Sequence, residues 1–536
     1  MLNQSIVKRL FFVLLMAISV AARAGAGIDE RLAQPQWQGL RVKADSLINF
    51  FQDRLLLVDP RSERGATLFH DYFDCVRVAL SLPYDLNDLR EEATWNRYLA
   101  YMMTYFYVCC DSMPGRTAEA YDNLLARKNF FFLHSGKKML LATSWQQVAQ
   151  RLAQHEAAVE LNDMKDEFLV VKHGYNEPHS IEVDSLLRAE ITQGLADEPL
   201  AIDRLYAHDG PLGRLGALLA PELRDVTTLY ISGNFMYNQI NFGAIPVGGG
   251  LTLADKCEVH QVLSTAAVGI ASARAGTISS AALFGGIDYE STQSGSEAAA
   301  VHNVPWNTRR GVPRDLRNGY GPLLHSRAEV LAADSVLTSS HIPTQVFLGS
   351  RATEQAVCQL DGRAPSLLHF STHGFMLAPL YTDSATLALD PCETRYLSAL
   401  SQSGLLFAGA NVTWRGQRHS LRGYDGILTS GELMRMDLSR CRLALLPACR
   451  GALGENTNLT GMPFGVAYAL KMAGVDQVLC SLWSVDDAAT CVYMKHFYHY
   501  LTQVGNPAAA LKLTVARMKR DGYTSPYYWA SFILVE

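Results

Sequence analysis

The chain has 536 residues, 49% of them apolar and 18% charged, and a net charge of −5 at pH 7. This composition is typical of globular proteins and excludes a largely disordered chain, and the length allows about two to four domains because single cores rarely exceed roughly 250–300 residues. The small net charge and the lack of a basic domain argue against nucleic acid as a partner.

The N-terminus, residues 1–26, has the three-part layout of a secretory signal peptide. Lys8 and Arg9 precede an apolar run at 10–20, and small residues with a candidate cleavage site follow at 22–26. The run is shorter than the about 20 residues that span a membrane. We therefore expect a periplasmic or secreted protein without an integral membrane segment. A buried or amphipathic first helix in a cytoplasmic protein is the alternative.

Residues 28–165 have a helical pattern. Apolar residues recur at three- and four-residue spacing, as in Leu40, Ala44, Leu47 and Phe51, and further helices are predicted at 118–132 and 145–155. The pattern indicates an all-α region of packed helical hairpins. No clean 34-residue tetratricopeptide register is present, so a degenerate, TPR-like repeat stays an alternative.

From residue 166 to the end, short and continuously apolar segments alternate with helical patterns. Such segments are typical of strands buried on both faces, so we predict an α/β sandwich, a mostly parallel sheet flanked by helices. The predicted strands cover residues 168–171, 228–232, 281–284, 345–348, 366–371, 442–447, 476–483 and 530–535. The predicted covering helices are 463–473, 488–501 and 507–520. Two arginine-bearing segments, 290–320 and 410–423, are predicted to be exposed insertions.

Two of the predicted strands each end at a reactive side chain. The strand at 366–371 runs into His373-Gly374, and the strand at 442–447 runs into Cys449-Arg450-Gly451. If these strands are parallel neighbours, both side chains face one crevice at the carboxyl edge of the sheet. An imidazole beside a thiol can take its proton and later protonate a leaving amine. The backbone N–H groups of Gly374 and Cys449 are candidates for an oxyanion hole.

Each residue alone is a weak signal. A strand-end cysteine is more often a small buried hydrophobic residue, and His173-Gly174 also follows a strand in this chain. The ten cysteines form no C-x-x-C pair and no zinc-type set with histidine, so we expect neither a metal nor another cofactor. His369 is predicted to lie in the core, Glu432 to belong to a helix start, and Asp425 to shape a turn.

Several segments carry a resemblance to a known family. Residues 447–451, PACRG, are similar to the caspase signature Q-A-C-R-G, with Pro447 in place of glutamine. The segments HFSTHG, DGILTSGEL, LLPACRGALGE, GMPFGVAYALKMAGVDQVLCSLWSVDD and PYYWASFILVE resemble the CHAT domain more closely, together with LYISGNFMYNQINFGAIP and ALFGGIDY. The CHAT domain is a caspase- and separase-like cysteine peptidase domain (clan CD) that often follows tetratricopeptide repeats.

The resemblance covers roughly residues 166–536 and implies an α/β caspase-like sandwich with a Cys/His peptidase dyad, carried here by Cys449 and His373. It divides the region into a first, non-catalytic half at 166–330 and a catalytic half at 331–536. Arg450 departs from the family, because many members have an acidic residue after the cysteine, and Pro447 stands where many have serine. These departures put the substrate preference in doubt more than the dyad.

Related separase-like peptidases hold a basic P1 residue with a carboxylate. The segment 482–487 resembles the stretch that supplies it, with Asp487 the better match, Asp486 the other candidate and Trp483 a wall of the cleft or a core residue. The alternative is that Asp486 and Asp487 cap the helix starting near residue 488. If P1 is basic, Arg309-Arg310 and the segment 415–422 become candidate self-cleavage sites.

The expected function is that of a cysteine endopeptidase acting on protein or peptide substrates, and activated by a partner or by self-cleavage. A catalytically silent scaffold, whose helical region binds a partner protein, is the alternative from another class. Transpeptidation through the same acyl-enzyme is a third reading that hydrolysis does not exclude.

Overall fold

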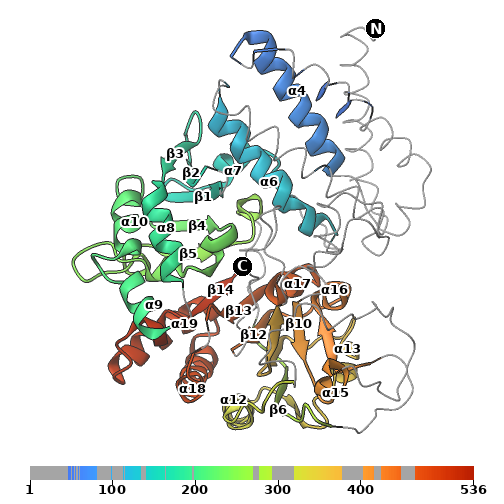
Figure 1. The fold of residues 1–536 in the computed structure, drawn as a ribbon. Helices are drawn as coiled ribbons and strands as arrows, with labels where there is room; N and C mark the ends of the chain where they lie inside the picture. The colour runs from blue at the N-terminus through green and yellow to red at the C-terminus, as the bar shows by residue number, and fades with distance from the viewer. Residues whose placement is uncertain are drawn as a thin grey trace. The chain divides into compact units, whose positions relative to one another are not determined.

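A computed structural model describes most of the chain in two compact units. The described residues are 46, 48–49, 51–52, 55, 58–59, 61–80, 98, 113, 115–134, 141–162, 165–195, 198–269, 277–291, 319–376, 403–415, 424–447, 465–483 and 485–536. One unit consists of residues 1–182 with 264–270 and 382–397, and the other of residues 183–263, 271–381 and 398–536. Figure 1 shows their helices and strands in chain order. The signal-peptide segment lies outside the described residues.

The N-terminal unit combines helices with a small antiparallel sheet. Its helices are α4 (Glu63–Leu80), α6 (Arg116–His134) and α7 (Trp145–Arg151), and its strands are β1 (Glu156–Asn162), β2 (Glu167–Lys172) and β3 (His179–Glu182), in the order β3-β2-β1. The prediction of an all-α region up to residue 165 is therefore wrong for residues 156–162. Local preference in EAAVELN favours a helix, but pairing along β2 and burial of β1 override it. The TPR-like repeat stays a prediction.

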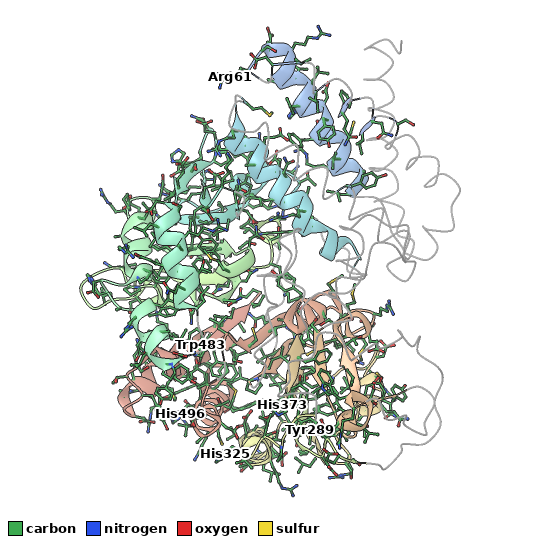
Figure 2. All side chains as sticks on the ribbon, in the orientation of Figure 1. Arg61, Tyr289, His325, His373, Trp483 and His496 are labelled. Carbon is green, nitrogen blue, oxygen red and sulfur yellow. The ribbon has the colours of Figure 1, made fainter. Side chains whose placement is uncertain are left out.

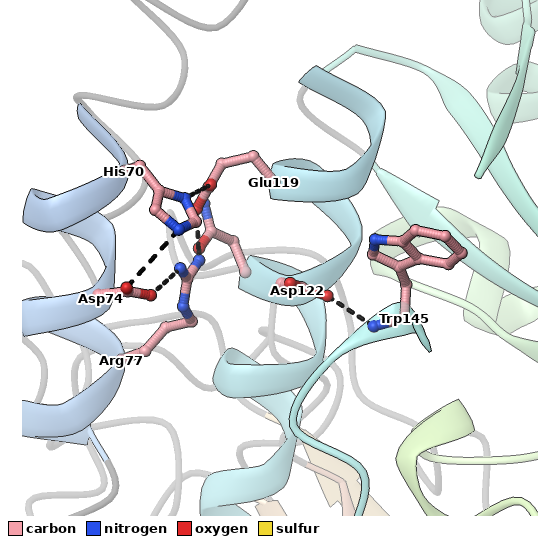
Figure 3. Close-up of polar contacts among 7 residues, drawn as sticks. His70, Asp74, Arg77, Glu119, Asp122 and Trp145 are labelled. Atoms are coloured by element: carbon pink, nitrogen blue, oxygen red, sulfur yellow. Dashed lines mark hydrogen bonds and ion pairs between the residues drawn. The ribbon is translucent and has the colours of Figure 1, made fainter. Parts of the chain in front are cut away.

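A polar network that includes the buried Glu119 and Asn123 joins α4 to α6 (Figure 3). The guanidinium of Arg77 contacts Asp74, Glu119 and Asn123, and the imidazole Nδ1 of His70 lies 2.8 Å from Glu119 Oε2. Because Arg77 neutralises the nearly buried Glu119, the pKa of that carboxyl falls below its usual value even though burial alone would raise it. Ion pairing therefore fixes the helices alongside apolar contact.

The C-terminal unit contains most of the α/β region predicted from residue 166 onward, but residues 166–182, with the predicted strand at 168–171, belong to the N-terminal unit. Its strands are β4 (Thr228–Ser232), β5 (Glu258–Gln261), β6 (Ala281–Ile287), β7 (Thr344–Gly349), β8 (Leu367–Phe370), β9 (Gly374–Met376), β10 (Ser403–Leu406), β11 (Ile427–Thr429), β12 (Leu443–Leu446), β13 (Gln477–Ser481) and β14 (Phe532–Val535). Its helices are α8 (Ser185–Gly194), α9 (Pro199–Leu205), α10 (Pro211–Leu219), α11 (Leu253–Lys256), α12 (Ser326–Ser339), α13 (Glu354–Cys358), α15 (Ala410–Trp414), α16 (Ser430–Leu433), α17 (Val466–Met472), α18 (Asp487–Val504), α19 (Pro507–Arg520) and α20 (Pro526–Trp529).

The large sheet of this unit is mostly parallel. Its described strands follow the order β4-β5-β14-β13-β12-β8-β6-β7, and β14 is antiparallel to β13 while the other described pairs run parallel. All residues of β8 and β12 are buried, as their continuous apolar runs predict for strands covered on both faces. The predicted α/β sandwich is confirmed.

Helices pack along this sheet in groups. α18 contacts both α12 and α19, and α12 lies against β6, whereas α17 contacts β13 and α16. Local sequence sets the ends of these helices. Asp486 caps α18, which ends at Gly505 with φ 69°, and Asn506 caps α19 with Pro507 at its first position. The predicted helices at 488–501 and 507–520 match α18 and α19.

A second sheet, in the order β11-β10-β9, is antiparallel and starts directly after His373. The prediction of an exposed insertion at 410–423 is wrong for its first residues, because 410–414 form α15. Trp414 of α15 is buried against Tyr320 and Phe375, with ring centroids 5.1 and 5.4 Å away. Residues 292–318 and 416–423, with Arg309-Arg310, lie outside the described residues. In the described part of the chain, no helix is long and apolar enough to span a bilayer.

Candidate active site

Four neighbouring strands of the large sheet end at the same edge. β13, β12, β8 and β6 are adjacent and mutually parallel. The carboxyl ends of parallel strands meet at one edge of the sheet, where ligands bind in open α/β folds. Three of these strands are followed by residues that the sequence predicts for the site, His373 after β8, Cys449 after β12 and Asp487 after β13, and Tyr289 follows β6. β8 and β12 are therefore parallel neighbours, as a shared crevice for His373 and Cys449 requires.

Cys449 itself lies outside the described residues. Its strand, β12, ends at Leu446, and the buried Pro447 is the last described residue before it. The structure therefore describes His373 and its surroundings, while the position of Cys449 beside it stays a prediction from the sequence.

His373 is half-buried and held at both its backbone and its ring. Its backbone N–H donates to the hydroxyl of Tyr289 at 3.1 Å, and its Nε2 lies 2.8 Å from the carbonyl oxygen of Gly321. A carbonyl only accepts, so this hydrogen bond requires the proton on Nε2 and leaves Nδ1 as the basic nitrogen of the neutral ring. Figure 2 shows His373 near Tyr289 and His325.

Burial lowers the pKa of His373 below its usual 6.5. The hydrogen bond to Gly321 and the negative charge of Asp487 act in the opposite direction, but burial is the largest effect. The imidazole is therefore neutral at neutral pH and can accept a proton.

Two tyrosines flank the imidazole. The ring centroids of Tyr289 and Tyr320 lie 5.3 and 5.1 Å from that of His373, and both rings are tilted against it. The Tyr289 hydroxyl also lies 3.0 Å from the Thr372 hydroxyl oxygen. Together these contacts restrict how the imidazole can rotate.

The backbone N–H of Gly374 faces away from β10. The Leu406 N–H donates to His373 O at 3.0 Å, which makes these two residues a hydrogen-bonded pair of the ladder. Because such pairs alternate in antiparallel sheets, the next pair, Leu405 and Gly374, exchanges no ladder hydrogen bonds. β9 is an edge strand among the described residues. The geometry is compatible with the oxyanion-hole role predicted for Gly374.

The two aspartates after β13 have different positions. Asp486 is exposed and its side chain accepts from the Ala489 N–H at 2.9 Å, so it caps α18. Asp487 is half-buried, and its Oδ2 accepts from the backbone N–H of His325 at 2.7 Å. Only Asp487 has a charge that acts on the pKa of His373. Capping therefore accounts for Asp486, and Asp487 is the carboxylate associated with His373.

Trp483 lies in the core rather than beside His373. It is 4% exposed, its Nε1–H donates to Tyr527 O at 2.9 Å, and its ring packs near Tyr206. This placement favours the core reading of Trp483 over the substrate contact. His369 is 0% exposed, which confirms its prediction as a core residue.

The turn predictions near β11 also hold. Thr429 and Glu432 form a reciprocal capping box at α16, and the Asp425 carboxylate accepts from the Ile427 N–H at 3.0 Å. Within the described residues, no group of three or more His, Cys, Asp or Glu side chains is placed to bind a metal.

Sequence reasoning missed the residues that surround the imidazole. Tyr289 had a usable signal, because it follows an apolar strand in the same way as His373. Tyr320 and Asn411 had none, because the segments containing them were assigned to exposed insertions, and Gly321 directly follows the first of these segments.

Comparisons with known proteins give one family and several distant structures. The family model "CHAT domain" matches residues 211–536. The crystal structure of the Arg-specific cysteine proteinase gingipain R is 11% identical, with a TM-score of 0.32, covering 60% of this chain and 66% of that one. The complex of Porphyromonas gingivalis RgpB pro- and mature domains is 10% identical, with a TM-score of 0.33, covering 66% and 77%. The chain thus spans less than two thirds of the gingipain R chain. A comparison with curated proteins finds no match.

Proposed function

The chain belongs to the CHAT domain family, and from this premise we propose that it is a cysteine endopeptidase with Cys449 as nucleophile and His373 as base. The family carries a caspase-like fold, and the mostly parallel sheet of the C-terminal unit has that architecture. That the chain is catalytically active, which substrates it cleaves and how it is activated are parts of this proposal.

The observation that carries the proposal is the pairing of β8 with β12. Leu367 pairs with Leu443 and His369 with Leu445, a constant offset of 76 residues. His373 and Cys449 are also 76 residues apart in the sequence. A register that continued beyond the two strands would bring the thiol to the imidazole. Unrelated strand-end residues would have no reason to share the offset of their strands.

The chemistry follows from the environment of His373. Its Nδ1 would take the thiol proton of Cys449, and the thiolate would attack the scissile carbonyl carbon. The N–H of Gly374 would donate to the resulting oxyanion. The imidazolium would then protonate the leaving amine as the C–N bond breaks, and water would hydrolyse the thioester. The Gly321 carbonyl accepts from Nε2–H throughout, which keeps Nδ1 directed to the thiol.

For the substrate we propose a basic P1 residue held by Asp487. The negative charge of the half-buried Asp487 carboxylate raises the pKa of His373. Its Oδ2 accepts from the His325 N–H, and its other oxygen, Oδ1, would contact the substrate. An Arg or Lys side chain would pair with it through charge-assisted hydrogen bonds. Asp486 would not serve, because its side chain caps α18.

A P1-varied set of fluorogenic tetrapeptides tests both assignments. Wild type should turn over Arg or Lys substrates, and Cys449→Ala and His373→Ala should each lose roughly 10³-fold or more in kcat/KM, as expected for members of one catalytic unit. Asp487→Ala should lose basic-P1 turnover while Cys449 still reacts with iodoacetamide, and Asp486→Ala is the matched control with unchanged P1 preference. Turnover that survives Cys449→Ala would remove the dyad.

Self-cleavage is the activation route that the basic preference suggests. Arg309-Arg310 and the arginines of residues 415–422 are the candidate sites. Intact mass after incubation should show cleavage at one of these arginines in wild type and none in Cys449→Ala. An intact wild-type chain that still turns over peptides would point instead to activation by a partner protein.

The alternative from another class is a catalytically silent scaffold whose N-terminal residues 28–165 bind a partner protein. It would be supported if the wild-type chain turned over no peptide and was not labelled by an Arg-chloromethylketone. Export to the periplasm or medium stays a proposal that rests on residues 1–26.

A further inference from the structure

A single buried asparagine on α15 connects two other backbone segments near His373, residues 289–290 and 319–321. Asn411, on α15, is 2% exposed. Its Nδ2 donates to Tyr320 O at 2.9 Å, and its Oδ1 accepts from Tyr320 N at 2.8 Å. One side chain thus pairs with both backbone polar groups of Tyr320, as a neighbouring strand would.

The same residue also reaches the segment after β6. The Asn411 backbone N–H donates to Tyr289 O at 3.0 Å, and the second hydrogen of Nδ2 goes to Glu290 Oε1 at 2.9 Å. Arg415 in turn contacts Glu290 and donates from Nε to Asn411 O at 3.1 Å. Tyr289 and Tyr320, the two rings that flank His373, are therefore held by one residue.

The close approach at Gly319 shows that this arrangement is built into the chain. Gly319 has φ +99°, a conformation that favours glycine, and a Cβ at this position would lie 2.4 Å from Asn411 Oδ1. Only glycine lets the segment 319–321 lie this close to the amide. Gly321, two residues on, supplies the carbonyl that accepts from His373 Nε2.

We infer that Asn411 is a positioning residue for the active site, which holds the segment 319–321 over His373 and thereby sets the tautomer and the burial of the imidazole. It acts through Tyr320 and Gly321 and not on the reacting atoms. The inference deepens the proposed function, on which its catalytic consequence rests, but the effect on His373 is measurable without activity.

Two variants disrupt the side-chain hydrogen bonds of Asn411 in different ways. Asn411→Ala removes all side-chain hydrogen bonds, and Asn411→Asp keeps the shape but sets a carboxylate against Glu290 and the Tyr320 carbonyl, which all accept. Asn241→Ala is the matched control. The Asn241 amide also joins two backbone groups, Ala530 O at 3.0 Å and Phe532 O at 3.1 Å, beside β14, which β13 and β12 separate from β8.

The readout is the pKa of His373 in the full-length Cys449→Ala protein, from hydrogen exchange at the imidazole C2 followed by mass spectrometry. Burial is the largest effect on this pKa and lowers it, so exposing the ring should raise the pKa toward 6.5 in both Asn411 variants. Loss of the Gly321 hydrogen bond lowers the pKa, but by less than the exposure raises it. Asn241→Ala should leave it unchanged. A His373 pKa that stays at or below the wild-type value in both folded Asn411 variants overturns the inference.

A kinetic arm, with Cys449 restored, separates this inference from the proposed function. If the chain is a peptidase, Asn411→Asp should reduce kcat/KM about 10- to 100-fold, mainly in kcat, because the base is misaligned. If wild type turns over no peptide, the proposed function fails while the shift of the His373 pKa still decides the role of Asn411. Wild-type kcat in both Asn411 variants contradicts the inference.

Discussion

At the scale of single residues, His373 is defined by what surrounds it more than by its own type. Burial between Tyr289 and Tyr320 favours the neutral ring, and the Gly321 carbonyl selects which nitrogen keeps the proton. The charge of Asp487 opposes burial, because a nearby anion favours the imidazolium. The pKa of this histidine is therefore a balance between burial, which lowers it, and the Gly321 hydrogen bond and Asp487 charge, which raise it.

This balance predicts the effect of removing the charge. In the Cys449→Ala background, Asp487→Asn should lower the pKa of His373 further below 6.5, because the anion that raises it is gone while the oxygen that accepts from His325 stays. The change should appear in the imidazole C2 exchange of His373 as a midpoint at lower pH. Asp486→Asn alters the neighbouring carboxylate and should leave that midpoint where it is. A higher midpoint in Asp487→Asn would contradict the assignment of this charge.

At the scale of elements, the second sheet and the short helices around it depend on buried polar anchors. Glu354, the first residue of α13, accepts from Asp425 N at 2.9 Å and Gly426 N at 2.8 Å and so fixes the turn before β11. Gly426 has φ 84° and lies directly beside the backbone of Ala410, where α15 begins. One carboxyl thus determines where the helix that carries Asn411 starts.

Glu354 predicts a change of stability with pH. Burial, followed by the charges of Asp425 and Glu432, raises its pKa well above 4.5, whereas the unfolded chain ionises near that value. The free energy of unfolding should therefore fall as pH rises above about 4.5, since the unfolded state then releases a proton that the folded state keeps.

Glu354→Gln should remove much of this dependence, because a neutral amide oxygen can accept both N–H groups. Glu354→Ala leaves both N–H groups without their acceptor and should cost about 2 kcal/mol or more. Denaturant unfolding at pH 6 and 8 measures both effects. A glutamine variant as unstable as the alanine variant would show that the charge of Glu354 is needed.

At the scale of the whole molecule, each unit combines buried strands with polar pairs, as with His369 and Glu329 of the C-terminal unit, whose Nε2 and Oε1 lie 2.8 Å apart. The C-terminal unit buries continuous apolar strands, with β8 and β12 buried along their whole length. The N-terminal unit adds ion pairs inside its helical layer, where Arg77 contacts Asp74 and Glu119 (Figure 3). Breaking such pairs on one side is costly because a charge is left buried.

The N-terminal unit should lose stability as the pH rises from acidic to neutral values. Burial raises the pKa of Asp122 from 3.8 to about 7, and a hydrogen bond to Glu119 raises that of His70. Both groups hold protons that the unfolded chain releases, so stability falls between about pH 4 and 7 for Asp122 and above pH 6.5 for His70.

Thermal unfolding of the full chain at pH 5.5 and 7.5 measures this trend. Asp122→Asn should flatten it, because the amide oxygen can still accept from the Trp145 N–H. Asp361→Asn in the other unit, where the carboxylate accepts from the Asp437 N–H, is the matched control and should leave the trend as in wild type. A trend that persists unchanged in Asp122→Asn would assign it to other groups.

The sequence by itself determined the α/β class of the C-terminal unit, most of its sheet strands, and the ends of α18 and α19. These features depend on local patterns, such as the apolar run of β12 or the Asn506-Pro507 start of α19. The sequence also placed His373 and Cys449 after two such strands. It failed at β1, whose local preference is helical, and at α15, whose burial comes from distant partners.

Only the tertiary structure decided which strands are neighbours and what surrounds the imidazole. The parallel pairing of β8 with β12, and its register, depend on the packing of the whole sheet. The partners of His373 come from 52 and 84 residues away, and those of Asn411 from 91 and 121. Contacts over such separations leave no periodic trace in the chain, because they are set by how finished elements pack and not by the residues next to them.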